Sequence, residues 1–281
     1  MSATPDVGPD VGPDVRPDVR PGEGGAGEGG AGGGGGRGRS RTVHRRTAWR
    51  RGPDGAEFRV RRSHPAGPPR ATVVVAGPGS VSALDEDGTD ARLVARLTRE
   101  LVAAGAQVLE CDMPRREPGC PVAAADEGVR ADRLEQLVAA HRHLVAGPLG
   151  LVGFSLGGMA VLRLLESGRL RRADRVVLVG VVLAEESFLD AEVGSVDLVY
   201  GGLDLVGYLT DEGSRRPGSL PPAVLGPEMY GEWSARRVVG RHPLSVRVRL
   251  LEGLGHTLQP LVPEAPHDPV AALAERALPR P

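Results

Sequence analysis

Residues 149–159 read LGLVGFSLGGM, an apolar run with strand character that breaks into the pattern G-x-S-x-G. A serine raised above the end of a strand requires a very tight strand-to-helix turn, and glycines on both sides let the backbone approach its neighbours closely. After the serine, apolar residues recur at helical spacing until Gly168. The stretch therefore predicts a strand, a sharp turn that exposes Ser155, and a helix.

Two later segments have the same strand-then-turn character. Residues 195–204, SVDLVYGGLD, read as a buried strand, a glycine turn and an acid, Asp204. Residues 246–256, VRVRLLEGLGH, alternate in polarity and then give way to a glycine-flanked loop that carries His256. The chain order is therefore serine, acid, histidine, which differs from the orders of the chymotrypsin and subtilisin types.

At these motifs the sequence resembles the α/β-hydrolase fold family. GFSLGG, YGGLD and LEGLGH are similar to that family's nucleophile elbow, acid turn and histidine loop, and the resemblance covers roughly residues 56–281. It implies a metal-free and cofactor-free serine hydrolase that cleaves a carboxylic ester, lactone or thioester. The resemblance identifies neither the acyl group of the substrate nor the molecule to which that group is transferred.

The proposed roles follow from what a serine hydroxyl cannot do alone. It is a weak nucleophile near neutral pH and needs an adjacent base, which His256 can supply. Asp204 would hold the second imidazole nitrogen, fix the tautomer and stabilise the imidazolium.

Other residues compete for two of these roles. The alternative acids are Asp211, Glu185, Glu186 and Asp190. His267 is the rival histidine, but it precedes Asp268 and Pro269, which suit the N-cap and first turn of a C-terminal helix. Four further histidines are set aside because they precede the core or fall on a helix: His44, His64, His141 and His143.

An acyl-transfer site also needs backbone donors for the oxyanion. One should be the N–H of Leu156, directly after the nucleophile, and the other should come from the loop after an earlier strand, Ala71–Val75. That loop lacks the His-Gly pair of many relatives, and Pro78 has no N–H to donate. We expect the Gly77 N–H to serve, with Gly79 as the fallback.

Composition limits the other function classes. The chain has no Lys, Asn or Ile, so all 35 basic residues are Arg, as a GC-rich coding sequence would produce. The net charge of −1 argues against a general nucleic-acid binder. Cys111 and Cys120 are too few for a disulfide scaffold and are expected to be free thiols in a cytoplasmic protein. No run approaches the ~18 apolar residues of a membrane span.

The first 55 residues differ from the rest. A Pro-Asp-Val repeat, glycine runs and the basic stretch Arg37–Arg51 leave too little apolar surface to offset backbone ordering, so we expect a disordered tail. No apolar segment of secretory type follows a basic cluster. The remainder, residues 56–281, is large enough for one domain with a substantial core.

That domain alternates strands with helices, which predicts a mostly parallel sheet covered on both faces. Only residues 183–194 lie between the strand after the elbow helix and the acid strand, too few for a large cap. The longer excursion lies between Asp204 and His256 and includes Tyr208, Tyr230 and Trp233, either as a pocket wall or as packing on the sheet. We expect a small-molecule acyl substrate; the sequence does not indicate the oligomeric state. An acyltransferase, a biosynthetic thioesterase and a non-catalytic ligand-binding protein are the alternatives.

Overall fold

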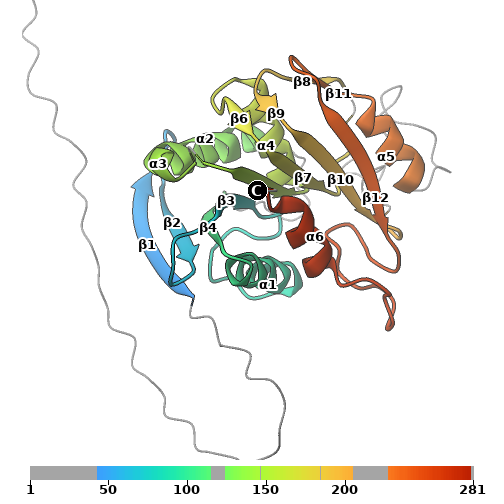
Figure 1. Cartoon of the computed structure of the whole chain (residues 1–281), viewed down its shortest axis with the longest axis horizontal. Coiled ribbons are helices and arrows are strands. Elements are labelled where there is room, and N and C mark those ends of the chain that lie inside the picture. The colour runs from blue at the N-terminus through green and yellow to red at the C-terminus, as the bar shows by residue number, and fades with distance from the viewer. Residues whose placement is uncertain (1–42, 115–123, 146, 184, 205–226, 280–281) are drawn as a thin grey trace, which may run out of the picture. The chain divides into compact units, whose positions relative to one another are not determined.

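An eight-stranded sheet forms the centre of the computed structural model, which describes residues 43–114, 124–145, 147–183, 185–204 and 227–279 (Figure 1). Its strands are β1 (His44–Arg51), β2 (Glu57–His64), β3 (Ala71–Ala76), β4 (Ala106–Cys111), β5 (Leu149–Phe154), β7 (Arg175–Val179), β10 (Ser195–Gly201) and β12 (Ser245–Leu251). Their order across the sheet is β1-β2-β4-β3-β5-β7-β10-β12.

The six strands from β4 to β12 are parallel, whereas β1 and β2 are antiparallel additions at one edge. Strands β3, β4, β5 and β10 are buried along their whole length. Such apolar runs suit the middle of a parallel sheet, because helices cover both of its faces. The parallel strands all end at one edge of the sheet, where sheets of this kind bind ligands.

Helices lie in a layer on each face of the sheet (Figure 1). One layer holds α1 (Thr89–Ala103) and α6 (Pro269–Ala277), and the other holds α2 (Ala124–Ala140), α3 (Arg142–Val145), α4 (Leu156–Glu166) and α5 (Pro227–Ala235). Leu97 and Leu101 of α1 and Leu273 of α6 are fully buried against the first face. Leu162 and Leu165 of α4 belong to the core on the second face. The predicted α/β class, with a mostly parallel sheet covered on both faces, is confirmed.

The start of the domain differs from the expected boundary at residue 55. β1 begins at His44 and pairs with β2 along its whole length, from His44 opposite His64 to Arg51 opposite Glu57. The sequence conceals this strand because its residues are mostly basic and exposed, and backbone pairing rather than an apolar face holds it in the sheet. Residues 1–42 of the expected tail lie outside the described residues.

Small departures occur in the connections. The helix expected over 130–146 begins earlier, as α2, and is interrupted at His141 before α3. Two short pairs of strands were not predicted: β6 (Arg172–Ala173) with β9 (Glu192–Val193), and β8 (Ser187–Leu189) with β11 (Val238–Gly240). Within the described ranges, no separate helical cap domain stands on the sheet. No helix in these ranges is long and apolar enough to cross a membrane.

Candidate active site

Ser155 occupies the turn between β5 and α4 in a backbone conformation that L-residues rarely adopt. Its φ is 49° and its ψ is −116°. A non-glycine residue in such a region is strained and persists only where its surroundings fix it. The Ser155 N–H donates to the Val179 carbonyl at the end of β7, 2.7 Å away. The strand-turn-helix predicted from LGLVGFSLGGM is therefore present, with the serine at its tightest point.

The glycines around Ser155 are required by close backbone packing. A Cβ at Gly153 would lie 2.5 Å from the Cα of Gly158, and one at Gly158 would lie 2.4 Å from a methyl group of Val181. A Cβ at Gly157 would meet the carbonyl oxygens of residues 76 and 77, each 2.4 Å away. Because real Cβ atoms do not approach so closely, larger residues at these positions would force the turn apart.

The structure brings the three predicted catalytic side chains together. His256 Nε2 lies 2.9 Å from Ser155 Oγ. On the other side of the ring, Nδ1 lies 3.1 Å from Oδ1 and 3.0 Å from Oδ2 of Asp204. The Asp204 side chain is fully buried and the His256 side chain is 15% exposed. A hydroxyl, an imidazole and a carboxylate are thus aligned within hydrogen-bond reach, the geometry that lets a serine lose its proton to a base.

The acid turn and the histidine loop are joined through their backbones. The Gly202 N–H donates to the Leu251 carbonyl and the Leu203 N–H to the Leu254 carbonyl, both at 2.9 Å. A Cβ at Gly201 would lie 2.2 Å from the same Leu254 carbonyl. These contacts fix the distance between Asp204 and the loop that carries the histidine.

The imidazole also rests on the end of β7. Gly180, with φ +64°, lies so close that a Cβ there would be 2.9 Å from Nδ1 and Cε1 of His256. Glycine at this position both permits the left-handed backbone and leaves room for the ring.

A second carboxylate, which sequence reasoning missed, links the loops on either side of the site. Asp90, in the first turn of α1, accepts hydrogen bonds from Thr257 Oγ1 at 2.6 Å and from Ser80 Oγ at 2.5 Å. Thr257 adjoins His256, and Ser80 lies in the loop after β3 that was expected to hold an oxyanion donor. The only signal in the sequence was an acid at the start of a predicted helix.

The predicted oxyanion donors lie beside the serine turn. Leu156 is the first residue of α4, and the first four N–H groups of a helix have no carbonyl partner within it. Gly77 follows β3, and its carbonyl oxygen faces Gly157. The N–H groups of Leu156 and Gly77, with Gly79 as the fallback, remain predicted donors.

The competing residues lie elsewhere or do different work. Glu185 and Glu186 are exposed, and Asp190 forms an ion pair with Arg241 at 2.8 Å. His267 is exposed, directly before the Asp268 N-cap, which accepts from the Val270 N–H at 3.0 Å. Asp211 and Tyr208 lie outside the described residues, as does the side chain of Tyr230.

Two further side chains bear on the expectations from sequence. Burial raises the pKa of the Cys111 thiol to about 12, so this cysteine is not a nucleophile near neutral pH. Cys120 lies outside the described residues.

Trp233 of α5 donates a hydrogen bond from Nε1 to the Leu183 carbonyl at 3.2 Å, so it packs the segment between Asp204 and His256 onto the loop after β7. In the described ranges, no three His, Cys, Asp or Glu side chains gather as metal ligands.

Comparison with known proteins gives matches only at the level of structure. No protein-family model and no curated protein matches the chain. It is similar to the dienelactone hydrolase from Anabaena variabilis, with 16% identity, a TM-score of 0.55, and 83% of this chain and 94% of that chain covered.

Two other solved structures are similar over nearly their whole length. A Xanthomonas campestris protein described as an α/β serine hydrolase without a lid has 16% identity and a TM-score of 0.51, with 84% of this chain and 96% of that one covered. A cold-adapted esterase from an Arctic intertidal metagenomic library has 15% identity and a TM-score of 0.51, with 85% and 96% covered. The chain therefore has the α/β-hydrolase fold.

Proposed function

We propose that the protein is a serine hydrolase that cleaves a carboxylic ester, lactone or thioester through an acyl-enzyme. The observation that carries the proposal is the alignment of Ser155 Oγ, the His256 imidazole and the Asp204 carboxylate, each within 3.1 Å of the next. The structures with the same fold include two proteins described as an esterase and a dienelactone hydrolase, which act on bonds of this kind.

In the proposed reaction, Ser155 Oγ attacks the carbonyl carbon of the substrate while His256 Nε2 takes the hydroxyl proton. The tetrahedral oxyanion accepts hydrogen bonds from the N–H groups of Leu156 and Gly77. His256 then gives the proton to the leaving alcohol or thiol as the bond to the carbonyl carbon breaks. Water, activated by the same imidazole, releases the acid; Asp204 stabilises the imidazolium in both halves.

The direct test combines covalent labelling with turnover. A fluorophosphonate probe should label the wild-type protein, and p-nitrophenyl esters and acyl thioesters of graded chain length should be hydrolysed. Ser155→Ala should abolish both, with a loss of several powers of ten in kcat, because nucleophile removal has that effect in other serine hydrolases. The variant should fold normally, since it loses one hydroxyl and no core volume.

The labelling result also separates the alternatives. Labelling without hydrolysis, but with acyl transfer to an added alcohol or thiol, would identify an acyltransferase. A wild-type protein that neither labels nor turns over any member of the panel would favour the non-catalytic binding protein. Turnover retained by purified Ser155→Ala would contradict the whole assignment.

A further inference from the structure

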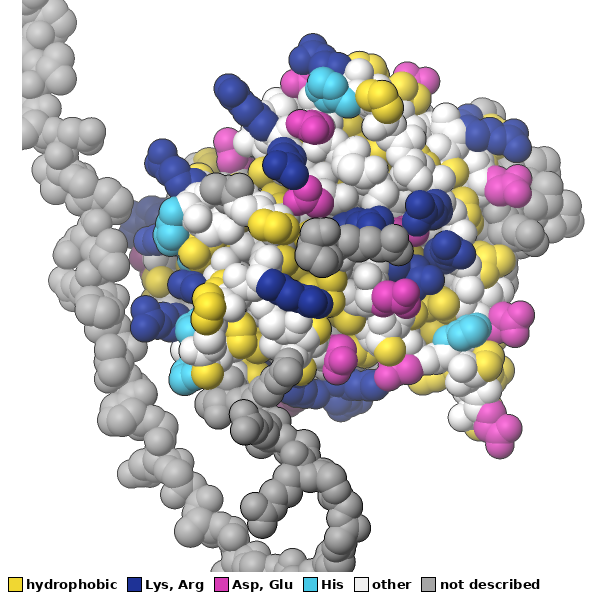
Figure 2. All heavy atoms as spheres, viewed as in Figure 1, with side chains coloured by type: hydrophobic (Ala, Val, Ile, Leu, Met, Phe, Trp, Pro, Cys, Tyr) yellow, Lys and Arg dark blue, Asp and Glu magenta, His cyan; other side chains and the backbone are white. Residues whose placement is uncertain are grey.

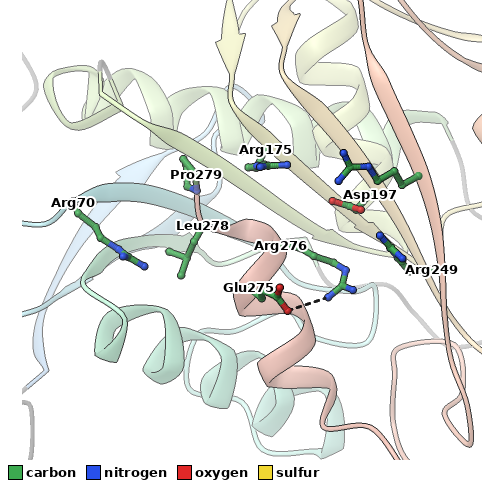
Figure 3. Close-up of a pocket in the computed structure, with 9 residues that line it drawn as sticks. Arg70, Arg175, Asp197, Arg249, Glu275, Arg276, Leu278 and Pro279 are labelled. Atoms are coloured by element: carbon green, nitrogen blue, oxygen red, sulfur yellow. Dashed lines mark ion pairs between the residues drawn. The ribbon is translucent and has the colours of Figure 1, made fainter. Parts of the chain in front are cut away.

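A second cavity lies away from Ser155, on the face of the sheet covered by α6 (Figure 3). It has a volume of about 350 Å³, within the usual range of small-molecule sites. Its lining residues come from β7, β10 and β12, from the residue before β3, and from the last turn of α6 and the residues after it. They are Arg70, Arg175, Asp197, Arg247, Arg249, Glu275, Arg276, Leu278 and Pro279.

The charge of this arginine pocket is its distinguishing feature. Five arginines and two carboxylates give it a formal charge of +3, although the whole chain has a net charge of −1. In the described part of the chain, no carboxylate lies within ion-pairing distance of Arg70, Arg247 or Arg249. Basic side chains also gather on this face of the molecule, around the end of α6 (Figure 2). A concave site with this excess of guanidinium groups attracts anions.

Two arginines of the pocket are held in place by the protein. Arg175 Nη1 donates to Ser195 Oγ at 2.8 Å, and Arg276 Nη1 donates to the Ala272 carbonyl at 2.6 Å. Both side chains are partly buried, whereas Arg247 and Arg249 are exposed at the rim. A guanidinium presents several N–H donors in one plane, so groups held in this way keep donors free for the oxygen atoms of a ligand.

Asp197 restricts the kind of anion that the pocket can bind. This residue is only 3% exposed, it lines the pocket, and it pairs with Arg247 on the neighbouring strand. An ionised carboxylate accepts hydrogen bonds and repels an anion, so it favours a ligand that also brings a donor such as a hydroxyl. Figure 3 shows its side chain among the arginines of the sheet, with Arg276 of α6 facing it across the cavity.

We propose that the arginine pocket binds a small phosphate ester that carries hydroxyl groups, with the phosphate on the arginines and a hydroxyl on Asp197. Arginine forms charge-assisted, often paired hydrogen bonds with phosphate oxygens, and a doubly charged phosphate suits the positive excess. The site is independent of the proposed ester hydrolysis, because none of Ser155, Asp204 and His256 lines the pocket.

Calorimetric titration of the full chain with ribose 5-phosphate and with inorganic phosphate, at fixed low salt, tests the proposal. Ribose 5-phosphate should bind, and more tightly than inorganic phosphate. Arg247→Gln/Arg249→Gln should weaken its binding about tenfold or more, because two charge-assisted donors are lost. The matched control is Arg51→Gln/Arg236→Gln, which removes two exposed arginines elsewhere and should leave the affinity unchanged.

Two further variants sharpen the result. Asp197→Asn should tighten inorganic phosphate and reduce the preference for the sugar phosphate. Ser155→Ala should bind both as the wild type does, so failure of the hydrolase proposal would leave this one standing. The proposal is overturned if ribose 5-phosphate does not bind at millimolar concentration, if the control pair weakens it equally, or if inorganic phosphate binds as tightly.

Discussion

The Asp90 carboxylate accepts hydrogen bonds from the hydroxyl groups of both Ser80 and Thr257. It therefore links the loop after β3 to the loop that carries His256. A group that holds both loops positions the site without touching the substrate. Loss of these hydrogen bonds should lower kcat more than it changes KM, because a misplaced imidazole or oxyanion donor affects the transition state more than substrate binding.

We expect Asp90→Ala, which removes both acceptor oxygens, to lower kcat about tenfold with a small change in KM, since misplacement by about an ångström has costs of this order or more. Thr257→Val should have a similar effect, and the double variant should lose little more, because both changes break the same hydrogen bond. The control is Asp87→Ala, at an exposed acid in the loop before α1. Additive losses in the double variant would show that the two residues act separately.

A second test on single residues concerns the acid of the proposed triad. Asp204→Asn should keep the fold but misorient His256, with a loss of up to about 10⁴ in kcat by analogy with other triads. Glu186→Gln and Asp190→Asn should be nearly silent, because Glu186 is exposed and Asp190 forms an ion pair with Arg241. Activity assays on the three purified variants decide between them; a silent Asp204→Asn would remove Asp204 from the proposed mechanism.

Among the secondary-structure elements, sequence patterns predicted the strands that are buried on both faces of the sheet and missed the exposed edge strand β1. β3 and β5 are short apolar runs, with Gly77 directly after β3 and Pro148 directly before β5, so local sequence is enough to predict them. β1 is exposed and basic, and only its pairing with β2 makes it a strand. Ser155, Asp204 and His256 could be predicted because each follows a strand in a short glycine-containing motif, whereas the Asp90–Thr257 hydrogen bond joins residues 167 apart and has no local signature.

The position of β1 sets the limit for shortening the chain. A protein that begins at residue 40 should match the full chain in kcat/KM and in melting temperature, because all the motif residues lie beyond it. One that begins at Gly55 loses β1, exposes the edge of β2 and should melt at least about 5 °C lower. Thermal unfolding and ester hydrolysis of both shortened proteins provide the measurement. Equal melting temperatures would show that β1 contributes nothing to stability.

For the molecule as a whole, Asp112 connects three parts of the first half of the domain. Its carboxylate accepts from the Arg59 backbone N–H and Nε, both at 2.9 Å, and from the Leu84 N–H at 2.8 Å. Burial alone would raise the pKa of this carboxyl, but the hydrogen bonds from Arg59 and Leu84 outweigh it and hold the pKa below the usual value of 3.8. The folded state therefore favours the ionised form.

This lowered pKa implies a loss of stability in acid. The contribution of Asp112 to stability is complete above the usual pKa of 3.8, which applies to the unfolded chain, and disappears as the pH falls through the lower pKa of the folded state. Asp112→Asn should cost about 2 kcal/mol at pH 7, the scale of a lost charge-assisted hydrogen bond. In urea unfolding, the gap between variant and wild type should narrow below about pH 4. A gap that stays constant down to pH 2 would mean that the carboxylate charge is unimportant.

The two edge strands of the sheet, β1 and β12, affect the tendency of the protein to self-associate. An open strand edge is a template on which a neighbouring molecule can add its own strand. Here β1 carries four arginines and β12 carries two, so matching edges repel each other. The range of that repulsion shrinks from about 10 Å in 0.1 M salt to about 3 Å in 1 M salt. Concentrated solutions should therefore remain dispersed in dilute buffer and become prone to edge-to-edge association as salt is added.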